Sequence, residues 1–411
     1  MGWIESLFGW LGSIVQTWWP ADSDSSLKSL LMDGIIGGVG GVMVFLPNIF
    51  LLFLSIAILE QSGYMTRAAF IMDNMMNKIG LNGKCFIPML IGFGCSIPAI
   101  MATRSLENRR DRLTTMLVIP LMSCGARFPI YALIIPAFFP QKWRGGMLLA
   151  IYMTGIILAI VLAKLLRSTI LKGESTPFAV ELLPYSIPNF KSVLSHMWGK
   201  GWLYLKTAGT LILGASIILW ALAFYPQKSL FDRDYEAMTS QVTTQFETAI
   251  QLPNANIDLE TALMEEQLEG IAQSRQAEEM AYTISGRIGR WTEPIMQPMG
   301  FDWRISTALI SALAAKEVFI AQIGIVYSVG GANEVSEALR KKLTENYSPL
   351  VGFCIMLFVL ISAPCMATVA ITMRESNSWK WAFLQFFGLT GLAWIITTIT
   401  YQVGTLLGIG V

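Results

Sequence analysis

The sequence predicts an all-α polytopic membrane protein with about eight transmembrane helices, within a range of roughly six to ten, some of them broken or re-entrant. Three observations lead to this fold class. Of the 411 residues, 54% are hydrophobic and only 14% are charged, whereas a soluble domain carries about a quarter charged residues. The mean hydropathy is +0.55. Apolar runs of membrane-spanning length recur along the chain, and several contain Pro and Gly together.

Eight apolar runs approach the about 20 residues that a spanning helix needs. They are 33–59, 85–102, 113–139, 147–166, 207–225, 305–328, 349–373 and 381–409. Trp residues are frequent before the first run, so we expect an amphipathic interfacial leader over residues 1–32. Segment 226–282 carries eleven acidic and three basic residues. It predicts one or two helices outside the bilayer, either a cap that concentrates cations or a solvated hairpin without such a role.

Basic residues concentrate in three loops, 103–112, 167–206 and 329–348. If the N-terminus is cytoplasmic and every apolar run crosses the bilayer, simple alternation places all three loops in the cytoplasm. This arrangement obeys the positive-inside rule. The acidic segment 226–282 then lies on the extracytoplasmic side.

Pro and Gly interrupt three of the apolar runs at membrane depth. The interrupted segments are GFGCSIPA (92–99), PLMSCGARFP (120–129) and SAPCMAT (362–368). Because Pro frees a backbone carbonyl and backbone groups in lipid must find partners, unwound backbone here has to face protein or a polar path. We therefore expect a polar path where these helices break.

Each break carries a cysteine: Cys95, Cys124 or Cys365. A cysteine sulfur can become a thiolate ligand, and Met122 offers a thioether sulfur beside Cys124. These donors suit a borderline or soft metal ion, whereas Mg²⁺ and Ca²⁺ prefer oxygen ligands. The alternative is that each cysteine behaves as a small hydrophobic residue, which is its commonest role.

Ionisable residues within apolar runs are costly and mark functional sites. Arg127 lies inside the third run, and Lys316 and Glu317 lie in the sixth. Glu317 could ligate a cation while Lys316 resets the site, or the two could neutralise each other. Glu60 at the end of the first run and Asp73 after it are further candidates for the path.

Motifs for enzymatic chemistry are absent from the sequence. It contains no G-x-x-x-x-G-K-[ST] phosphate-binding loop and no G-x-S-x-G nucleophile motif, and its single histidine, His196, excludes a His-based metal site. Five cysteines, mostly in apolar runs, make a poor disulfide framework. The net charge of +1 gives no indication of a nucleic-acid partner. We therefore expect no enzyme on this polypeptide.

Two weak echoes indicate internal duplication. CSIPAIMATR from Cys95 and CMATVAITMR from Cys365 each reach an Arg nine residues on, and residues 72–96 align with 292–316, with Gly80 on Gly300. The two echoes do not share one register. Duplicated halves with helices broken in matching places are a common build of membrane transporters.

Five segments form a specific combination: LEQSGYMTRAAFIMD (59–73), GFGCSIPAIMATR (92–104), PLMSCGARFPIYAL (120–133), ALAAKEV (312–318) and APCMATVAITMRE (363–375). Together they resemble the bacterial ferrous iron transporter B family, the membrane subunit of the Feo system. The resemblance implies that Fe²⁺ is the transported substrate and that it is taken up across the bacterial cytoplasmic (inner) membrane. It also places Cys95, Cys124 and Cys365 on the iron path. It also implies that Lys316 and Glu317 belong to a second gate.

The resemblance further implies partners. Family members carry an N-terminal GTP-binding domain, so GTP and Mg²⁺ would act through a domain that is not on this chain, linked in cis or in trans. Small cytoplasmic Feo subunits are expected partners as well, besides the lipid bilayer. Gln61 stands where the family pattern has Asp. The sequence leaves open whether copies form a homo-oligomer.

The predicted organisation comprises six parts. They are an interfacial leader (1–32), a first gate repeat (33–170), a cytoplasmic loop (171–206), a transmembrane helix that opens the second repeat (207–225), an acidic extracytoplasmic helical insertion (226–282), and a second gate repeat with the C-terminal helices (283–411). Two other functions stay open: a nucleoside-type carrier of small solutes and a membrane scaffold that transports nothing. A nucleoside site would need aromatic and amide side chains, and GFGCSIPA has no Asn or Gln.

Overall fold

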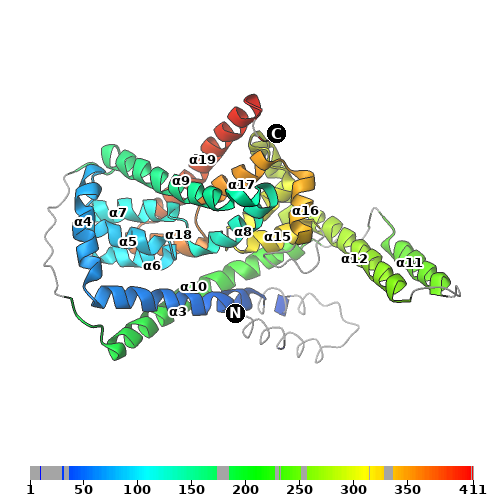
Figure 1. Cartoon of the computed structure of the whole chain (residues 1–411), viewed down its shortest axis with the longest axis horizontal. Coiled ribbons are helices and arrows are strands. Elements are labelled where there is room, and N and C mark those ends of the chain that lie inside the picture. Colours follow the sequence, from blue (N-terminus) through cyan, green and yellow to red (C-terminus); the bar gives the residue numbers. More distant parts are fainter. Residues whose placement is uncertain are drawn as a thin grey trace.

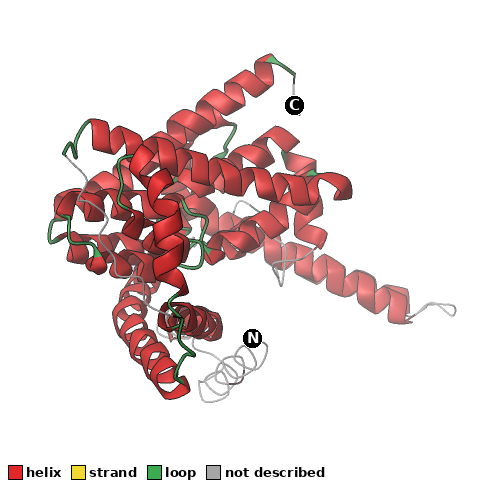
Figure 2. Ribbon diagram, turned by 60° about the vertical axis from the view of Figure 1, so that its left-hand side comes forward, coloured by secondary structure: helices red, strands yellow, loops and turns green. Residues whose placement is uncertain are grey.

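The computed structural model describes residues 10, 30–31, 37–173, 185–226, 231, 233–250, 257–313, 315–327, 337–408 and 410. Within these ranges the regular elements are helices and no strand occurs, as Figure 2 shows. The predicted all-α class is therefore confirmed for the described part. The predicted leader over 1–32 lies outside the described residues, apart from Trp10 and Leu30–Leu31.

The first half of the described chain runs from α3 to α9 (Figure 1). Its elements are α3 (Gly37–Gln61), α4 (Tyr64–Lys78), η2 (Gly83–Cys85), α5 (Phe86–Gly92), α6 (Ser96–Ala102), η3 (Thr103–Ser105), α7 (Arg109–Val118), η4 (Ile119–Leu121), η5 (Gly125–Arg127), α8 (Phe128–Phe138) and α9 (Gln141–Ser168).

The second half runs from α10 to α19. Its elements are α10 (Phe190–Phe224), α11 (Tyr235–Ile250), α12 (Ile257–Tyr282), α13 (Ile284–Met296), η6 (Gln297–Met299), α14 (Trp303–Ser311), α15 (Val318–Val326), α16 (Glu337–Asn346), α17 (Pro349–Ile361), α18 (Met366–Ser376) and α19 (Trp379–Leu406).

Short polar side chains fix where many of these helices begin. Asn108 accepts a hydrogen bond from the Arg110 backbone at the start of α7, and Asp302 does the same for Ile305 at the start of α14. Such caps satisfy amide groups that have no partner in the first turn of a helix. They place the ends of short helices even where hydropathy changes little.

Segment 85–102 forms a hairpin of two short helices and does not cross the molecule. Helices α5 and α6 pack against each other, and the residues that flank the pair meet, since Lys84 Nζ lies 3.3 Å from Glu107 Oε1. Both ends of the segment therefore lie on one side. This agrees with the predicted broken or re-entrant helix and excludes a plain span.

A second hairpin, α14–α15, has the same architecture. Asp302 precedes α14 and Tyr327 follows α15, yet both meet Tyr347: the Tyr327 hydroxyl donates to that of Tyr347, and the Tyr347 hydroxyl donates to Asp302 Oδ1 at 2.8 Å. The Arg304 guanidinium also lies over the Tyr327 ring, 5.0 Å from its centre. Run 305–328, predicted as a span, therefore turns back to the side from which it entered.

In the described chain, four continuous segments are long and apolar enough to cross a membrane. They are Arg109–Phe138, Gln141–Ser168, Pro349–Ser376 and Trp379–Leu406, and the count rises to five if Leu46–Gln61 and Tyr64–Lys78, bent by 80°, are taken together. The predicted number of about eight spans thus stays a prediction. Two of the eight expected runs are the hairpins described above.

Two ion pairs show which loops share a side. Lys200 Nζ lies 3.3 Å from Glu60 Oε2, so the end of α3 meets the start of α10. Arg104 pairs with Glu375, so the end of α6 meets the end of α18. We call the side that carries these pairs the basic side; α4 lies along it at the left of Figure 1.

The alternation predicted for the basic loops is therefore wrong for the last one. Span Pro349–Ser376 begins next to Tyr347 and ends at the basic side, where Glu375 pairs with Arg104. Arg340, which lies before this span, is at the opposite side, as is α16 in Figure 1. The error arose because a hairpin changes the parity of all later loops, and hydropathy does not tell a hairpin from a span.

The two halves repeat with inverted orientation. Each half has a long helix (α3 or α10), an amphipathic helix (α4 or α13), a hairpin (α5–α6 or α14–α15), a broken span and a final long helix (α9 or α19). The hairpins enter from opposite sides. Gly80 at φ 82° and Gly300 at φ 77° occupy matching left-handed positions, which favour glycine. The alignment of residues 72–96 with 292–316 thus pairs positions that correspond in the two halves of the structure.

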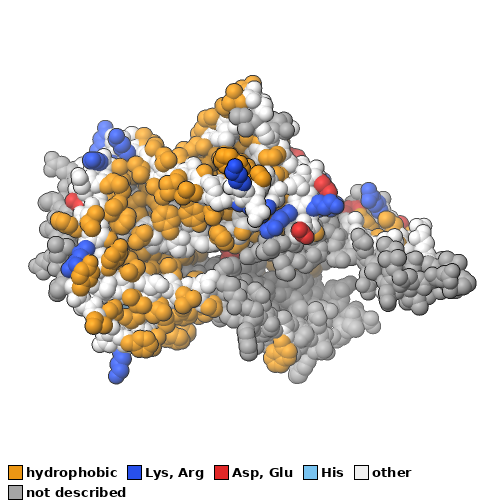
Figure 3. All heavy atoms as spheres, in the orientation of Figure 1, with side chains coloured by type: hydrophobic (Ala, Val, Ile, Leu, Met, Phe, Trp, Pro, Cys, Tyr) orange, Lys and Arg blue, Asp and Glu red, His pale blue; other side chains and the backbone are white. Residues whose placement is uncertain are grey.

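The broken spans form the centre, and α9 and α19 lie outside them. In the broken spans Arg109–Phe138 and Pro349–Ser376, 72% and 83% of the most apolar stretch of 18 residues is buried inside the protein. The corresponding values for α9 and α19 are 22% and 28%. In Figure 3, apolar side chains are frequent over the described part of the face, at the left and the top of the view. This pattern suits a bundle whose outer helices contact lipid.

The acidic insertion contains two helices, α11 and α12, which pack together. The Tyr235 hydroxyl donates to Glu278 Oε2 at 2.6 Å and links them. They project to the right in Figure 1, at the side opposite the basic side. A role as an electrostatic cap stays a prediction.

Candidate functional site

The first hairpin breaks between Gly92 and Ser96. Cys95 has an extended backbone, with φ −154° and ψ 132°, and caps the first turn of α6. Gly94 allows a close approach of α3, because a Cβ atom at this position would lie 2.5 Å from Leu52 Cδ1. Gly94 therefore leaves room for the Leu52 side chain of α3 against the break.

The first broken span opens between η4 and η5, and its backbone pairs with that of the hairpin. Cys124 caps η5, and the next amide, Gly125 N, donates to Gly94 O at 3.0 Å. The fully buried Arg127 donates from Nη1 to Pro120 O at 2.7 Å and, more weakly, to Met122 O at 3.5 Å. Arg127 thus satisfies carbonyls that the break leaves without helical partners.

The second half repeats this arrangement with different residues. Helix α14 ends at Ser311, α15 begins at Val318, and Leu313 O between them accepts a hydrogen bond from Met366 N at 2.9 Å. Lys316, which is 3% exposed, donates from Nζ to Ser362 Oγ at 3.2 Å. The second hairpin and the second broken span are therefore also joined at their breaks.

All four breaks line one cavity, which we call the junction cavity, with a volume of about 320 Å³. Its lining includes the three predicted cysteines and three charged residues: Cys95, Cys124, Cys365, Arg127, Lys316 and Glu317. The Cys95 thiol lies close enough to the other two thiols and to Glu317 to interact with them electrostatically. Side chains that are far apart in sequence therefore meet.

Two of the thiols lie at helix N-termini. Cys95 immediately precedes α6 and Cys365 immediately precedes α18, and Cys365 Sγ is 3.1 Å from Thr368 Oγ1 in the first turn of α18. The cavity thus offers sulfur, a carboxylate and hydroxyl oxygen as donors, with the side chains of Arg127 and Lys316 at its wall.

The donors are gathered but not arranged as a closed metal site. Within the described ranges, no group of three or more His, Cys, Asp or Glu side chains is placed to hold a metal ion. A tight site binds its ion too strongly for release, and conduction requires weak or multiple sites.

The predicted path residues Met122, Glu60 and Asp73 are not among those that line the junction cavity. Met122 is buried and packs against Gly92, where an added Cβ atom would lie 3.2 Å from Met122 Cβ. Glu60 pairs with Lys200 on the basic side. Asp73 accepts from Gly83 N at 2.8 Å and from Asn77 Nδ2 at 2.8 Å, so it holds the turn after α4.

Three lining or neighbouring polar residues were missed by the sequence analysis. Asn48 on α3 and Thr368 on α18 line the cavity, and Ser362 accepts from Lys316. Asn48 was detectable as an amide beside Pro47 in an apolar run. The other two cysteines, Cys85 and Cys354, are fully buried and do not line the cavity.

Comparison with known proteins agrees with these features. A family model described as "Nucleoside recognition" matches residues 42–138 and 205–379. A second, described as "Ferrous iron transport protein B C terminus", matches residues 148–200 between the two parts. The chain belongs to the ferrous iron transporter B family. It corresponds to the membrane portion of that family.

Three relatives show the extent of the match. A "Fe(2+) transport protein A/Fe(2+) transporter FeoB fusion protein" of Porphyromonas gingivalis is 43% identical over 99% of this chain and 47% of its own length. The "Fe(2+) transporter FeoB" of Campylobacter jejuni is 40% identical over 99% and 60%. That of Helicobacter pylori strain J99 is 38% identical over 92% and 57%. The chain thus spans about half the length of these relatives. No solved structure matches it.

Proposed function

We propose that this chain forms the membrane path for ferrous iron into the bacterial cytoplasm, with the junction cavity as a transient binding site at its centre. The observation that carries the proposal is the meeting of Cys95, Cys124, Cys365 and Glu317 at one cavity. Thiolate and carboxylate donors suit a borderline divalent metal ion. The names of the relatives support iron as the cargo.

The inverted hairpins supply a route. Hairpin α14–α15 enters from the side of α11 and α12, and hairpin α5–α6 enters from the basic side. Because cytoplasmic loops are enriched in Lys and Arg, we assign the basic side to the cytoplasm. Fe²⁺ would pass the α14–α15 hairpin, exchange water for donors in the junction cavity, and leave past α5–α6.

The charges of the cavity constrain the ion that it holds. Arg127 adds a positive charge beside a single carboxylate, Glu317, and Lys316 adds a second one when it is protonated. A divalent cation is therefore favourable here only when thiols bind as thiolates, which are the metal-binding form of cysteine. Hard cations such as Mg²⁺ gain little from sulfur and are excluded on this ground.

Partners of the transport step are part of the proposal. Coupling to a GTP-binding domain rests on the family resemblance, and the fusion of the Porphyromonas relative with Fe(2+) transport protein A supports a small Feo subunit as a partner. The basic side offers the docking face for both. The transport step itself requires no enzymatic group on this chain.

A nucleoside-type carrier is the second candidate. The description of the first family model and the amide of Asn48 in the cavity favour it. Since Asn48 lines the cavity from α3, the lack of Asn and Gln at the breaks does not exclude a nucleoside. The three thiols have no use in binding a nucleoside, which favours iron.

Flux into proteoliposomes tests the proposal. The full chain is reconstituted, Fe²⁺ entry is followed with an internal fluorescent chelator, and adenosine is added as competitor. Cys95→Ser, Cys124→Ser and Cys365→Ser should each lower Fe²⁺ flux at least about tenfold, because a hydroxyl is a poor ligand for this ion. Cys85→Ser and Cys354→Ser are matched controls outside the cavity. Equal flux in all five variants would refute the three thiols as ligands on the path. No Fe²⁺ entry with the wild type, or inhibition of that entry by adenosine, would refute iron as the cargo.

A further inference from the structure

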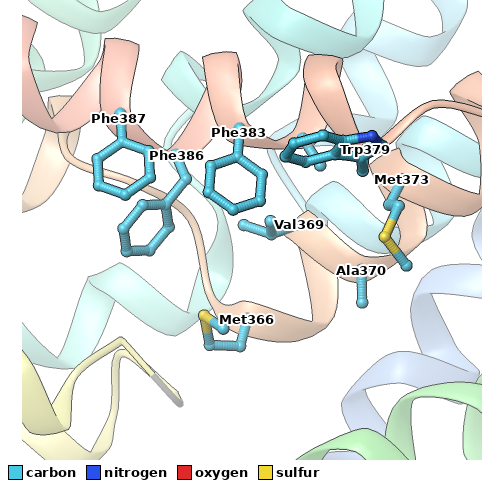
Figure 4. Close-up of a pocket in the computed structure, with 9 residues that line it drawn as sticks. Met366, Val369, Ala370, Met373, Trp379, Phe383, Phe386 and Phe387 are labelled. Carbon is cyan, nitrogen blue, oxygen red and sulfur yellow. The ribbon is translucent and has the colours of Figure 1, made fainter.

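A second site lies between α18 and α19, away from the junction cavity. Figure 4 shows Trp379, Phe383, Phe386 and Phe387 on α19 facing Met366 and Met373 on α18. The recess between these helices has a volume of about 330 Å³ and is lined by apolar side chains only. Trp379 and Phe387 remain 60% and 61% exposed, so the recess is open. Its apolar lining suits a hydrocarbon chain.

A polar recess continues from the apolar one. It has a volume of about 600 Å³ and shares Ala370, Met373 and Trp379 with the first. Its other lining residues include Arg374 and Asn377, at the turn from α18 to α19. An apolar slot thus opens directly into a pocket that carries a cation.

Arg374 is available to bind an external anion. No hydrogen bond or ion pair to Arg374 side-chain atoms occurs in the part of the chain that the structure describes, and the side chain is exposed. The adjacent carboxylate of Glu375 does not neutralise it, because Arg104 and Arg112 occupy both of its oxygens. The guanidinium is therefore an uncompensated charge at the mouth of an apolar slot.

The position along the membrane normal selects the ligand. Arg374 lies at the end of α18 on the basic side, beside the Arg104–Glu375 pair. Anionic lipids of the cytoplasmic leaflet gather at basic residues near the bilayer surface. Trp379 at the level of Arg374 also suits the headgroup region, where Trp is enriched.

We propose that this recess binds an anionic phospholipid, with one acyl chain between α18 and α19 and its phosphate on Arg374. Because α18 (Met366–Ser376) follows Cys365 of the junction cavity and carries Arg374 in its last turn, a bound lipid would brace the helix next to one of the cavity thiols. The lipid site does not depend on the identity of the transported ion.

Native mass spectrometry of the full chain in detergent tests the site. The delipidated protein is titrated with phosphatidylglycerol, with phosphatidylcholine of the same acyl chains, and with inorganic phosphate. The wild type should retain phosphatidylglycerol in preference to phosphatidylcholine, and inorganic phosphate should not displace it. Arg374→Gln should weaken phosphatidylglycerol retention about fivefold and phosphatidylcholine retention by less, because choline already neutralises the phosphate of that lipid.

Two further variants separate the slot from general surface charge. Arg109→Gln removes another exposed arginine of the basic side that does not line the recess, and it should retain the lipid as the wild type does. Ala370→Trp fills the slot and should lower retention of both lipids, with a melting temperature measured to verify folding. Equal retention in Arg374→Gln and wild type would overturn the proposal, as would equal losses in Arg374→Gln and Arg109→Gln. A dimer that forms without lipid and is lost in Ala370→Trp would assign the slot to a second copy instead.

Discussion

The contact between Arg104, Arg112 and Glu375 predicts a large loss of stability when the carboxylate is neutralised. Glu375 has a side chain only 4% exposed, and it joins the two halves of the molecule at the basic side. Arg104 donates to it from Nε at 2.7 Å and also from Nη2, and Arg112 donates from Nη2 at 3.2 Å. Hydrogen bonding to Glu375 raises the pKa of Arg104 above its ordinary value.

The magnitude follows from burial on the two sides of the contact. Hydrogen bonds to charged groups contribute about 1.5–3 kcal/mol each, but the Arg104 and Arg112 side chains are 51% and 29% exposed, and solvent screens their share. Glu375→Gln retains an acceptor and the Arg112 bond to the Glu375 backbone oxygen at 2.7 Å. We therefore expect a loss of about 2–3 kcal/mol in the free energy of unfolding.

Denaturant unfolding in mixed micelles, followed by intrinsic Trp fluorescence, measures this loss. Glu107→Gln is the matched control, because Glu107 makes an ion pair with Lys84 on the same side but is 84% exposed. Its effect should stay below about 0.5 kcal/mol. Equal effects of the two substitutions would refute the reasoning, since burial of the carboxylate would then not decide its contribution.

Two other substitutions test the hairpins. Gly94→Val places a side chain where a Cβ atom would already lie 2.5 Å from Leu52. Overpacking should therefore lower the free energy of unfolding by about 1–3 kcal/mol. An unchanged melting temperature would contradict the close approach of α3. Tyr347→Phe removes the hydrogen bond to Asp302. We expect a loss of about 1 kcal/mol and faster amide hydrogen exchange in α14–α15. Unchanged exchange there would argue that Tyr347 does not hold the two ends of this hairpin together.

Local chemistry made three of the four breaks predictable. Gly and Pro occur together in 92–99 and 120–129, and Pro364 lies in 362–368; each of these segments contains a break in the structure. The break between Ser311 and Val318 has no such signal, since its residues are mostly Ala and Leu. The alignment of Gly80 with Gly300 would have located it, because it superposes Cys95 on Ala315.

Long-range features could not be read from one sequence in the same way. Apolar length does not distinguish a hairpin from a span, so the side of Arg340 was predicted wrongly. Roles for Glu60 and Asp73 were inferred from charge in apolar surroundings, yet Lys200 and the Gly83 amide engage them away from the cavity. Asn48 was overlooked because a single amide in an apolar run carries little weight until its partners are known.

Site-resolved alkylation tests the central claim most directly. The purified full chain is labelled with a small maleimide under anaerobic conditions, with and without Fe²⁺, and the extent of labelling at each cysteine is read by mass spectrometry. The account predicts that Fe²⁺ slows labelling of Cys95, Cys124 and Cys365 together, while Mg²⁺ at the same concentration does not. Identical labelling of these three thiols with and without Fe²⁺ would contradict it.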